Sequence, residues 1–286
     1  MTIRNMSAKL ALLPTVLVIV VCFIGSICWT AYISFTRSGI MPNYTFVGFQ
    51  QYVRLFNSER WIVSFSNMFV FGGLMVAGSL MLGIGLAILI DSKIRFESIF
   101  RTVFLYPLSL SYIVTGLAWQ WLLTPSIGIQ QFVRGLGWDT FTFDWIIQKD
   151  YAIYTLVFAA VWHQAGLIMA IILAGLRGID DEIWRATKLE GISKPRVYAH
   201  VVLPMLKPLI VTCVVLLAIA VVKSYDLVVA MTDGGPGNSS DLPGRFVIDF
   251  TFERANLGLA SAAAMSMLIT IVAVMTPLFY TRKVKQ

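Results

Sequence analysis

Polar and charged side chains interrupt an apolar run that extends from Val221 to Met231. Lys223 and Asp226 lie three residues apart in this run, with Ser224 and Tyr225 between them. An ionisable side chain at membrane depth costs about 2.5–3.5 kcal/mol, so it is retained mostly where it serves a site. These residues predict a polar patch that faces a cavity, or, alternatively, a Lys223–Asp226 pair that neutralises itself on one helix face.

Polar side chains in other apolar runs are candidates to line the same path. They are Gln120 beside Trp119, Gln164 beside His163, and Asn67. Aromatic belts at the membrane interface explain tryptophans near span ends equally well. The histidines and cysteines show neither metal-ligand nor disulfide spacing, so the sequence predicts no metal site and no disulfide framework.

Motifs for catalysis are missing from the sequence. No G-x-x-x-x-G-K-S/T phosphate loop occurs, and the cluster Gly234–Gly237 lacks the lysine such a loop needs and is predicted to be a turn. No Ser/His/Asp set, G-x-S-x-G elbow or H-E-x-x-H motif occurs either. We therefore predict that the chain is not an enzyme and has no cofactor of its own. Uphill transport would need an ion gradient or another subunit.

The composition places the chain in a bilayer. Hydrophobic residues make up 58% of its 286 residues and charged residues only 13%, against about 25% charged in soluble proteins. Because backbone groups in hydrocarbon must be satisfied within the segment, long apolar runs predict helices, and about 20 residues cross the core. We predict an all-α membrane protein, one domain over residues 1–286 with a core at about 61–281. Its six transmembrane helices are expected at about 10–35, 61–90, 99–123, 151–176, 209–231 and 257–280.

Lys and Arg are distributed unevenly between the two sides of these runs. Fourteen of the 22 fall on one side and seven on the other. Since cytoplasmic loops carry the excess of positive charge, both termini and the charged segment 177–208 are predicted to be cytoplasmic.

Small residues recur at four-residue spacing in the second predicted span. Gly73 precedes Ala77, and Ser79, Gly83 and Ala87 follow the same step. Such spacing favours close helix approach. The contact could lie within this chain or with a second membrane subunit.

The charged segment 177–208 is predicted to contain a short capped helix. Acidic residues at 180–182 favour a helix start, and Gly191 can adopt the left-handed conformation that ends one. Ile183, Ala186 and Leu189 fall on one face and form an apolar stripe suited to a groove. A second helix is expected to begin near Ser193 and to kink at Pro204.

The same segment resembles the EAA loop of bacterial ABC importer permeases, which reads E-A-A-x-x-x-G followed by I-x-L-P. The matching positions are Arg185-Ala186-Thr187, Gly191 and Val201-Val202-Leu203-Pro204, with Arg185 in place of the acidic residue and Thr187 in place of the second alanine. Residues 46–52, 101–107 and 232–236 resemble the sugar-importing branch. Residues 105–116 and 223–243 are similar to glucose- or mannose-type permeases.

The resemblance implies a type I ABC importer permease of the bacterial inner membrane, working by alternating access. The expected partners are a second permease subunit, two cytoplasmic subunits that bind ATP and Mg²⁺, and a periplasmic sugar-binding protein. The residues from Asp181 to Gly191 would form the coupling helix that docks on an ATPase. Its members are Asp181, Glu182, Ile183, Arg185, Ala186, Thr187, Leu189, Glu190 and Gly191.

Two other functional classes fit parts of the pattern. An ion-coupled secondary transporter would use Lys223 and Asp226 as a relay, although no internal repeat of the kind common in such transporters is visible. A membrane scaffold without a transport role would need those two residues only for abundance.

Overall fold

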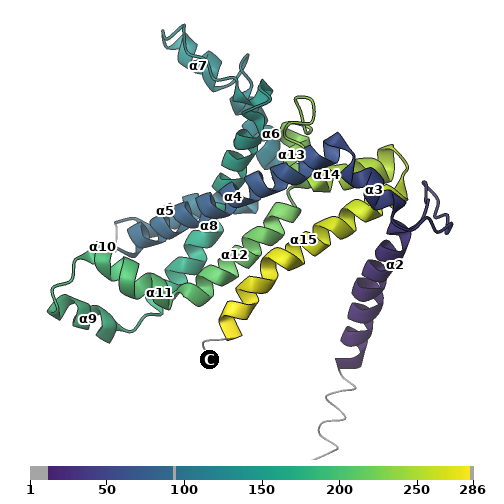
Figure 1. Ribbon diagram of the computed structural model, residues 1–286. Coiled ribbons are helices and arrows are strands. Elements are labelled where there is room, and N and C mark those ends of the chain that lie inside the picture. Colours follow the sequence, from purple (N-terminus) through teal and green to yellow (C-terminus); the bar gives the residue numbers. More distant parts are fainter. Residues whose placement is uncertain (1–11, 93–94, 284–286) are drawn as a thin grey trace, which may run out of the picture. The chain divides into compact units, whose positions relative to one another are not determined.

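The computed structural model describes residues 12–92 and 95–283, and every regular element in these ranges is a helix (Figure 1). Within them, β pairing is limited to one antiparallel bridge between Thr36 and Phe46. The all-α expectation is therefore confirmed.

Four helices are long and apolar enough to cross a membrane. They are Leu12–Ser34, which includes η1 (Ile19–Ile24) and α2 (Gly25–Ser34), then α4 (Glu59–Asp91), α8 (Ala152–Arg177), and Leu257–Pro277 of α15 (Leu257–Lys283). Two bent helix pairs bring the candidate spans in the described residues to six when each pair counts as one. This number agrees with the six apolar runs of the sequence.

The third predicted span, 99–123, is not one continuous helix. It consists of α5 (Glu97–Leu105), η2 (Tyr106–Ser109) and α6 (Tyr112–Leu123), with a bend of 101°. Pro107 lacks a backbone donor, Leu110 is extended, and the Ser111 side chain caps α6 by accepting a hydrogen bond from the Val114 amide at 3.3 Å. The sequence predicted a transmembrane helix here but not its bend, because apolar composition does not reveal a break whose polar groups are satisfied locally.

The fifth predicted span, 209–231, is also broken. It divides at Lys223 and Ser224 into α12 (Lys207–Val222) and α13 (Tyr225–Met231). The segment before it contains α10 (Lys194–Val197), η4 (Tyr198–Val202) and α11 (Leu203–Met205), and it meets α12 at 72°. Pro204 and Pro208 occupy the first turns of α11 and α12, so the predicted kink near Pro204 is confirmed.

The described residues form two compact units. Helices α4 and α15 each run from one unit into the other. The first contains residues before 63 and residues 246–270, and the second contains residues 63–245 and those after 270. The first unit includes α3 (Gln50–Phe56) and η5 (Asp249–Glu253), and α14 (Pro243–Ile248) runs across the boundary. The second adds α7 (Ile129–Gly135), η3 (Trp145–Ile147) and α9 (Asp181–Leu189).

Gln51 connects the non-helical segment of the first unit to its helices. Its side chain is 2% exposed and donates to the Thr36 carbonyl at 2.9 Å. Gly258 lies against both groups, and a Cβ there would come within 2.5 Å of the Thr36 oxygen. The motif at residues 46–52 therefore serves to pack this segment against the start of α15.

An ion cluster fixes the start of α4 in the same unit. Arg60 donates to Asp249 Oδ2, and Arg254 Nε lies 3.2 Å from the same oxygen. The rings of Phe246 and Phe250 stack beside the Arg60 guanidinium, 4.3 Å apart between centroids. Burial raises the pKa of Asp249, but the hydrogen bond and charge of Arg60 outweigh it and hold the pKa below its usual value.

Helices α4 and α8 approach closely in the second unit, beside one another in Figure 1. A Cβ at Gly83 would meet Ile168 Cβ at 2.6 Å and the Ala165 carbonyl oxygen at 3.0 Å. Ser79 and Ala87, one turn away on either side, are both fully buried. The small-residue pattern thus packs within this chain, whereas Gly73 has nothing within 4 Å of its Cβ position.

Gly83 and Gly73 provide a matched pair for testing this packing. We expect Gly83→Ala to lower the free energy of unfolding by roughly 1–3 kcal/mol, because the added methyl group overpacks the α4–α8 contact. Gly73→Ala should be neutral or stabilising by roughly 0.5–1 kcal/mol, because alanine favours the helix and meets no neighbour. Thermal unfolding of the purified protein in detergent measures both. Equal melting temperatures for the two variants would contradict the assignment.

Candidate functional site

The break in the fifth span brings a charged pair of side chains to a helix interruption. Lys223 ends α12 and Asp226 lies in the first turn of α13; both are exposed. Among the described residues no ion pair joins them, so the self-neutralising arrangement is not formed. Ser224 is fully buried, and its hydroxyl donates to the Ala220 carbonyl at 2.8 Å. Such a bond to the preceding turn is typical of a bent helix.

Helix α6 presents Gln120 and Trp119 to different neighbours. A Cβ at Gly116 would come within 2.7 Å of Ala230 Cβ and 3.2 Å of the Leu227 oxygen, so α6 and α13 touch at this glycine (Figure 1). Gln120, one turn further, lines a cavity at the end of α13. Trp119 instead contacts the rings of Phe158 and Trp162 on α8, at 4.9 and 5.6 Å between centroids.

His163 and Gln164 satisfy the break in the third span. His163 Nε2 lies 3.1 Å from the Leu110 carbonyl oxygen, which can only accept, so Nε2 carries the hydrogen. Its ring stacks on Tyr112 at 4.5 Å, and Gln164 Nε2 donates to the Tyr112 hydroxyl at 2.5 Å. The two side chains are 5% and 6% exposed. They hold the bend between η2 and α6 together.

Asn67 holds a loop of the same unit. Its amide donates to the carbonyls of Ser239 and Asp241, at 2.8 and 3.0 Å. In this structure, its amide hydrogens are directed to backbone, and its predicted place along the pathway stays a prediction.

The loop after α13, residues 232–242, is strongly cross-linked. The Ser240 hydroxyl contacts the Gly235 carbonyl at 2.5 Å and the Thr232 hydroxyl at 2.8 Å. Arg245 reaches Asp233 Oδ1 through Nε at 3.0 Å and through a terminal nitrogen at 2.9 Å. The glycine cluster is therefore part of a turn, as predicted, and Gly234 has φ +72°.

A cavity of about 330 Å³ lies between α6, η3 and this loop. Its lining combines the apolar side chains of η3 and α13 with polar ones, in full Gln120, Thr124, Ile146, Ile147, Val229, Met231, Thr232, Asp233, Gly235 and Pro236. Thr124, Thr232 and Asp233 were not singled out individually from the sequence. The signals that pointed to this loop were the glycine cluster and the resemblances over residues 232–236 and 223–243.

The predicted pathway residues fall into separate places rather than one patch. The group at Lys223 to Asp226 marks the fifth-span break, His163 and Gln164 mark the third-span break, and Gln120 lies at the cavity. Sequence reasoning missed Tyr112, which links the two α8 side chains to the bend.

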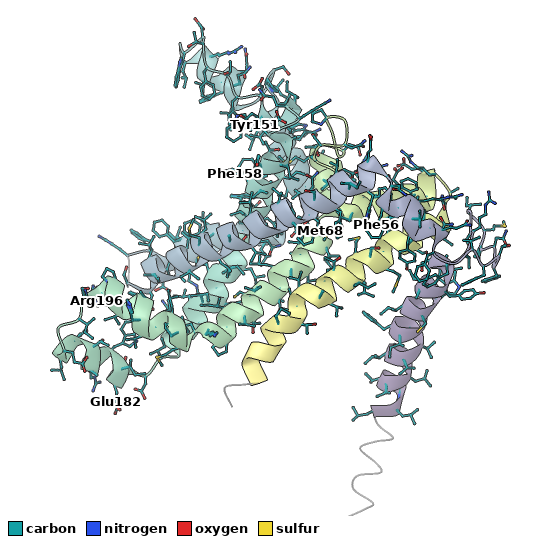
Figure 2. The ribbon with its side chains drawn as sticks, viewed as in Figure 1. Phe56, Met68, Tyr151, Phe158, Glu182 and Arg196 are labelled. Atoms are coloured by element: carbon teal, nitrogen blue, oxygen red, sulfur yellow. The ribbon has the colours of Figure 1, made fainter. Side chains whose placement is uncertain are left out.

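Helix α9 forms as the capping signals predict. The Asp180 carboxylate accepts from the Glu182 amide at 3.1 Å, and Gly191 has φ +68° just after the helix. Glu182 lies on its exposed side (Figure 2). Leu189 is 89% exposed and is therefore accessible to an apolar groove on a partner.

The opposite face of α9 packs on its own chain. Thr187 is buried, and Trp184 meets Tyr198 edge-on at 5.7 Å between centroids. Ile183 is half-buried, while Arg185 and Ala186 are exposed with Leu189. Thr187 therefore supports the helix from beneath, and the exposed face available to a partner contains Glu182, Arg185, Ala186 and Leu189.

Arg177, the last residue of α8, connects that helix to two others. Its guanidinium lies 2.7 Å from Glu97 at the start of α5 and 3.9 Å from Asp91 at the end of α4. Arg101 is 3.8 Å from Glu97. One charged cluster thus joins the ends of α8 and α4 to the start of α5.

Comparisons with known proteins agree with this architecture. Residues 79–284 match the family described as "Binding-protein-dependent transport system inner membrane component". A probable ABC transporter permease protein of Pyrococcus horikoshii is 34% identical over 273 residues, 95% of this chain and 94% of the relative. The xylose/arabinose import permease of Haloferax volcanii is 30% identical over 241 residues, 84% of this chain and 75% of the relative.

A solved structure has the same fold. A chain from the bacterial alginate ABC transporter in complex with an alginate pentasaccharide-bound periplasmic protein superposes with a TM-score of 0.84 at 17% identity, covering 99% of this chain and 96% of that chain. The predicted permease fold is confirmed.

His163 can be tested for its role at the third-span bend. His163→Phe retains a ring to stack on Tyr112 but removes the donor to the Leu110 carbonyl. Loss of this partly buried hydrogen bond should lower the free energy of unfolding by roughly 0.5–1.5 kcal/mol. The control His200→Phe changes an exposed histidine and should shift it by no more than about 0.5 kcal/mol. Identical melting temperatures for His163→Phe and the wild type would rule out this role.

Proposed function

The chain belongs to the family of binding-protein-dependent transport system inner membrane components, and on this basis we propose that it is the permease subunit of an ATP-driven sugar importer. It is a multi-pass membrane transporter component and not an enzyme. Family membership also argues against the alternative hypothesis, an ion-coupled secondary transporter.

The observation that carries the proposal is the exposed face of α9. A capped helix that leaves Leu189 89% exposed fits a groove on another protein, since amphipathic helices bind grooves through such anchors. The chain has no nucleotide-binding motif. We therefore assign ATP and Mg²⁺ to two separate cytoplasmic subunits, each docked on a permease.

The transported solute is proposed to be a monosaccharide of the glucose or mannose type. Support for this type of sugar comes from the resemblance over residues 105–116 and 223–243, while the relative from Haloferax volcanii is a permease for the pentoses xylose and arabinose. A second permease subunit would complete the pathway, and a periplasmic sugar-binding protein would deliver the sugar. Lys223, Ser224, Tyr225 and Asp226 would supply polar contacts at the fifth-span break.

Transport would proceed by alternating access. The permease would alternate between an inward-facing and an outward-facing state. ATP-driven closure of the two ATPases shifts the equilibrium between these states only if the ATPases bind them with different affinity. The docked α9 converts closure into a displacement of α8. The Arg177 cluster passes that displacement to α4 and α5.

A reconstituted complex tests the proposed function directly. We expect ATP-dependent uptake and sugar-stimulated ATPase activity when proteoliposomes holding both permeases, the ATPases and the binding protein are given D-glucose, D-mannose, D-xylose and L-arabinose in turn. Uptake that persists without ATP and collapses with an uncoupler would contradict the proposal. Stimulation by pentoses alone would correct only the sugar type.

Gly191 offers a test of coupling through α9. Gly191→Leu should separate ATP hydrolysis from uptake, because a side chain at φ +68° costs roughly 1–3 kcal/mol and shifts the end of the docking helix. The expected result is retained ATPase activity with uptake reduced about ten-fold or more, a barrier change of roughly 1.4 kcal/mol. Gly137→Leu is the matched control, since Gly137 also has positive φ and open space around it. Equal coupling ratios in both variants would remove α9 as the coupling element.

A further inference from the structure

We propose that the cavity between α6, η3 and the loop after α13 is a second sugar-binding subsite, distinct from the break at Lys223 and Ser224. In it, the Gln120 amide and the Asp233 carboxylate hydrogen-bond the hydroxyl groups of a neutral sugar. This inference rests on the proposed function. It adds the location of a sugar-binding site and a preference for neutral over acidic sugars.

The size and lining of the cavity suit a small polar ligand. Its volume of about 330 Å³ falls within the roughly 300–1,000 Å³ of ligand pockets in general. Ile146, Ile147, Val229 and Met231 provide apolar walls. A sugar ring has an apolar face of C–H groups and a rim of hydroxyls, so this combination of walls and polar groups is complementary to it.

Gln120 is positioned for binding and is not used by the fold. The α6–α13 contact at Gly116 fixes the helix one turn before it. Thr124 donates to the Gln120 backbone carbonyl at 2.7 Å, but in the described part of the chain the Gln120 side-chain amide has no hydrogen bond. A free amide can donate to one hydroxyl oxygen and accept from another hydroxyl.

Asp233 is held in an uncommon conformation at the edge of the cavity. Its φ is +48°, and such a backbone persists only where the surroundings impose it. Both contacts from Arg245 go to Oδ1, and within the described residues Oδ2 has no partner. An acceptor held this way is suited to a ligand hydroxyl.

The loop that carries Asp233 is ordered before any ligand arrives. Asn67 holds it at Ser239 and Asp241, the Ser240 hydroxyl closes its turn, and Arg245 also lies 3.6 Å from Asp241. A preorganised loop avoids the ordering cost that binding would otherwise pay. This explains why so many polar contacts are concentrated in residues 232–245.

The charges around the cavity favour a neutral sugar over an acidic one. Asp233 is the charged side chain in the cavity lining; it is paired with Arg245 and is 72% exposed, whereas Asp241 is fully buried and lies outside the lining. A carboxylate-bearing sugar would face like charge at Asp233, and like charge across a site is costly. We infer that the subsite selects against uronic acids.

Matched variants in the reconstituted complex test this subsite. Gln120→Leu and Asp233→Ala should each raise the concentration of D-glucose or D-mannose needed for half-maximal ATPase stimulation by about ten-fold, because one hydrogen bond to the ligand is lost. Asp233→Asn should also narrow the preference for D-glucose over D-glucuronate. Gln131→Leu and Asp139→Asn, exposed residues outside the cavity, are the controls and should behave as the wild type.

Two outcomes distinguish failure of the subsite from failure of the function. If the wild type is stimulated by sugar and both cavity variants match it, the subsite is wrong and the proposed function stands. If no sugar drives uptake or stimulation in the wild type, the proposed function fails, and the subsite fails with it.

Thiol labelling provides a readout that does not depend on transport. Gln120→Cys, in a protein whose Cys22 and Cys28 are replaced by serine, should react with a membrane-impermeant thiol reagent and be protected by D-glucose or D-mannose. Protection by the sugar-free binding protein alone would mean that the cavity receives a protein loop, which would overturn the proposal. Absence of protection by every sugar tested would overturn it as well.

Discussion

Backbone amide and carbonyl groups inside a bilayer must find partners within the protein, and this constraint shapes the whole structure. In the continuous helices α4, α8 and α15, the backbone groups bond to one another within the helix. Where a span breaks, side chains supply what the helix no longer does: His163 reaches the Leu110 carbonyl at the third-span bend, and Ser224 bonds to the turn before the fifth-span break. A polar residue in an apolar sequence can therefore either line a binding site or satisfy backbone groups at a helix break. Only its partners in the structure distinguish these two roles.

Close approach between helix backbones is a second condition on which the packing of the structure depends. Glycines at positions 83 and 116 let α4 meet α8 and α6 meet α13 with no side chain between them. In the second unit these contacts join α4 to α8 and α6 to α13. The Arg177 cluster lies where α9 joins that unit, and its exposed salt bridges, individually worth about 0–1 kcal/mol, gain importance from joining three helices at one point.

The loop after α13 is held by many polar contacts. Its hydrogen bonds and ion pairs hold Asp233, with φ +48°, in the lining of the cavity that also contains Gln120 and apolar side chains. A loop of glycine, proline and serine would otherwise be mobile. These contacts hold polar groups of the loop at the cavity, apart in sequence from the break at Lys223 and Ser224.

The sequence by itself determined the features that depend on local composition. Six apolar runs, the absence of a nucleotide-binding motif, and the caps at Asp180 and Gly191 predicted the spans, the need for a partner ATPase and the extent of α9. Hydropathy could not show the bends at Leu110 or Lys223, because an apolar run has the same composition whether it is straight or broken. Nor could it assign partners: His163 and Leu110 are 53 residues apart, and Asn67 and Ser239 are 172 apart. Only tertiary packing brings such groups together, and so only the structure showed that His163 and Asn67 support the fold while Gln120 faces a cavity.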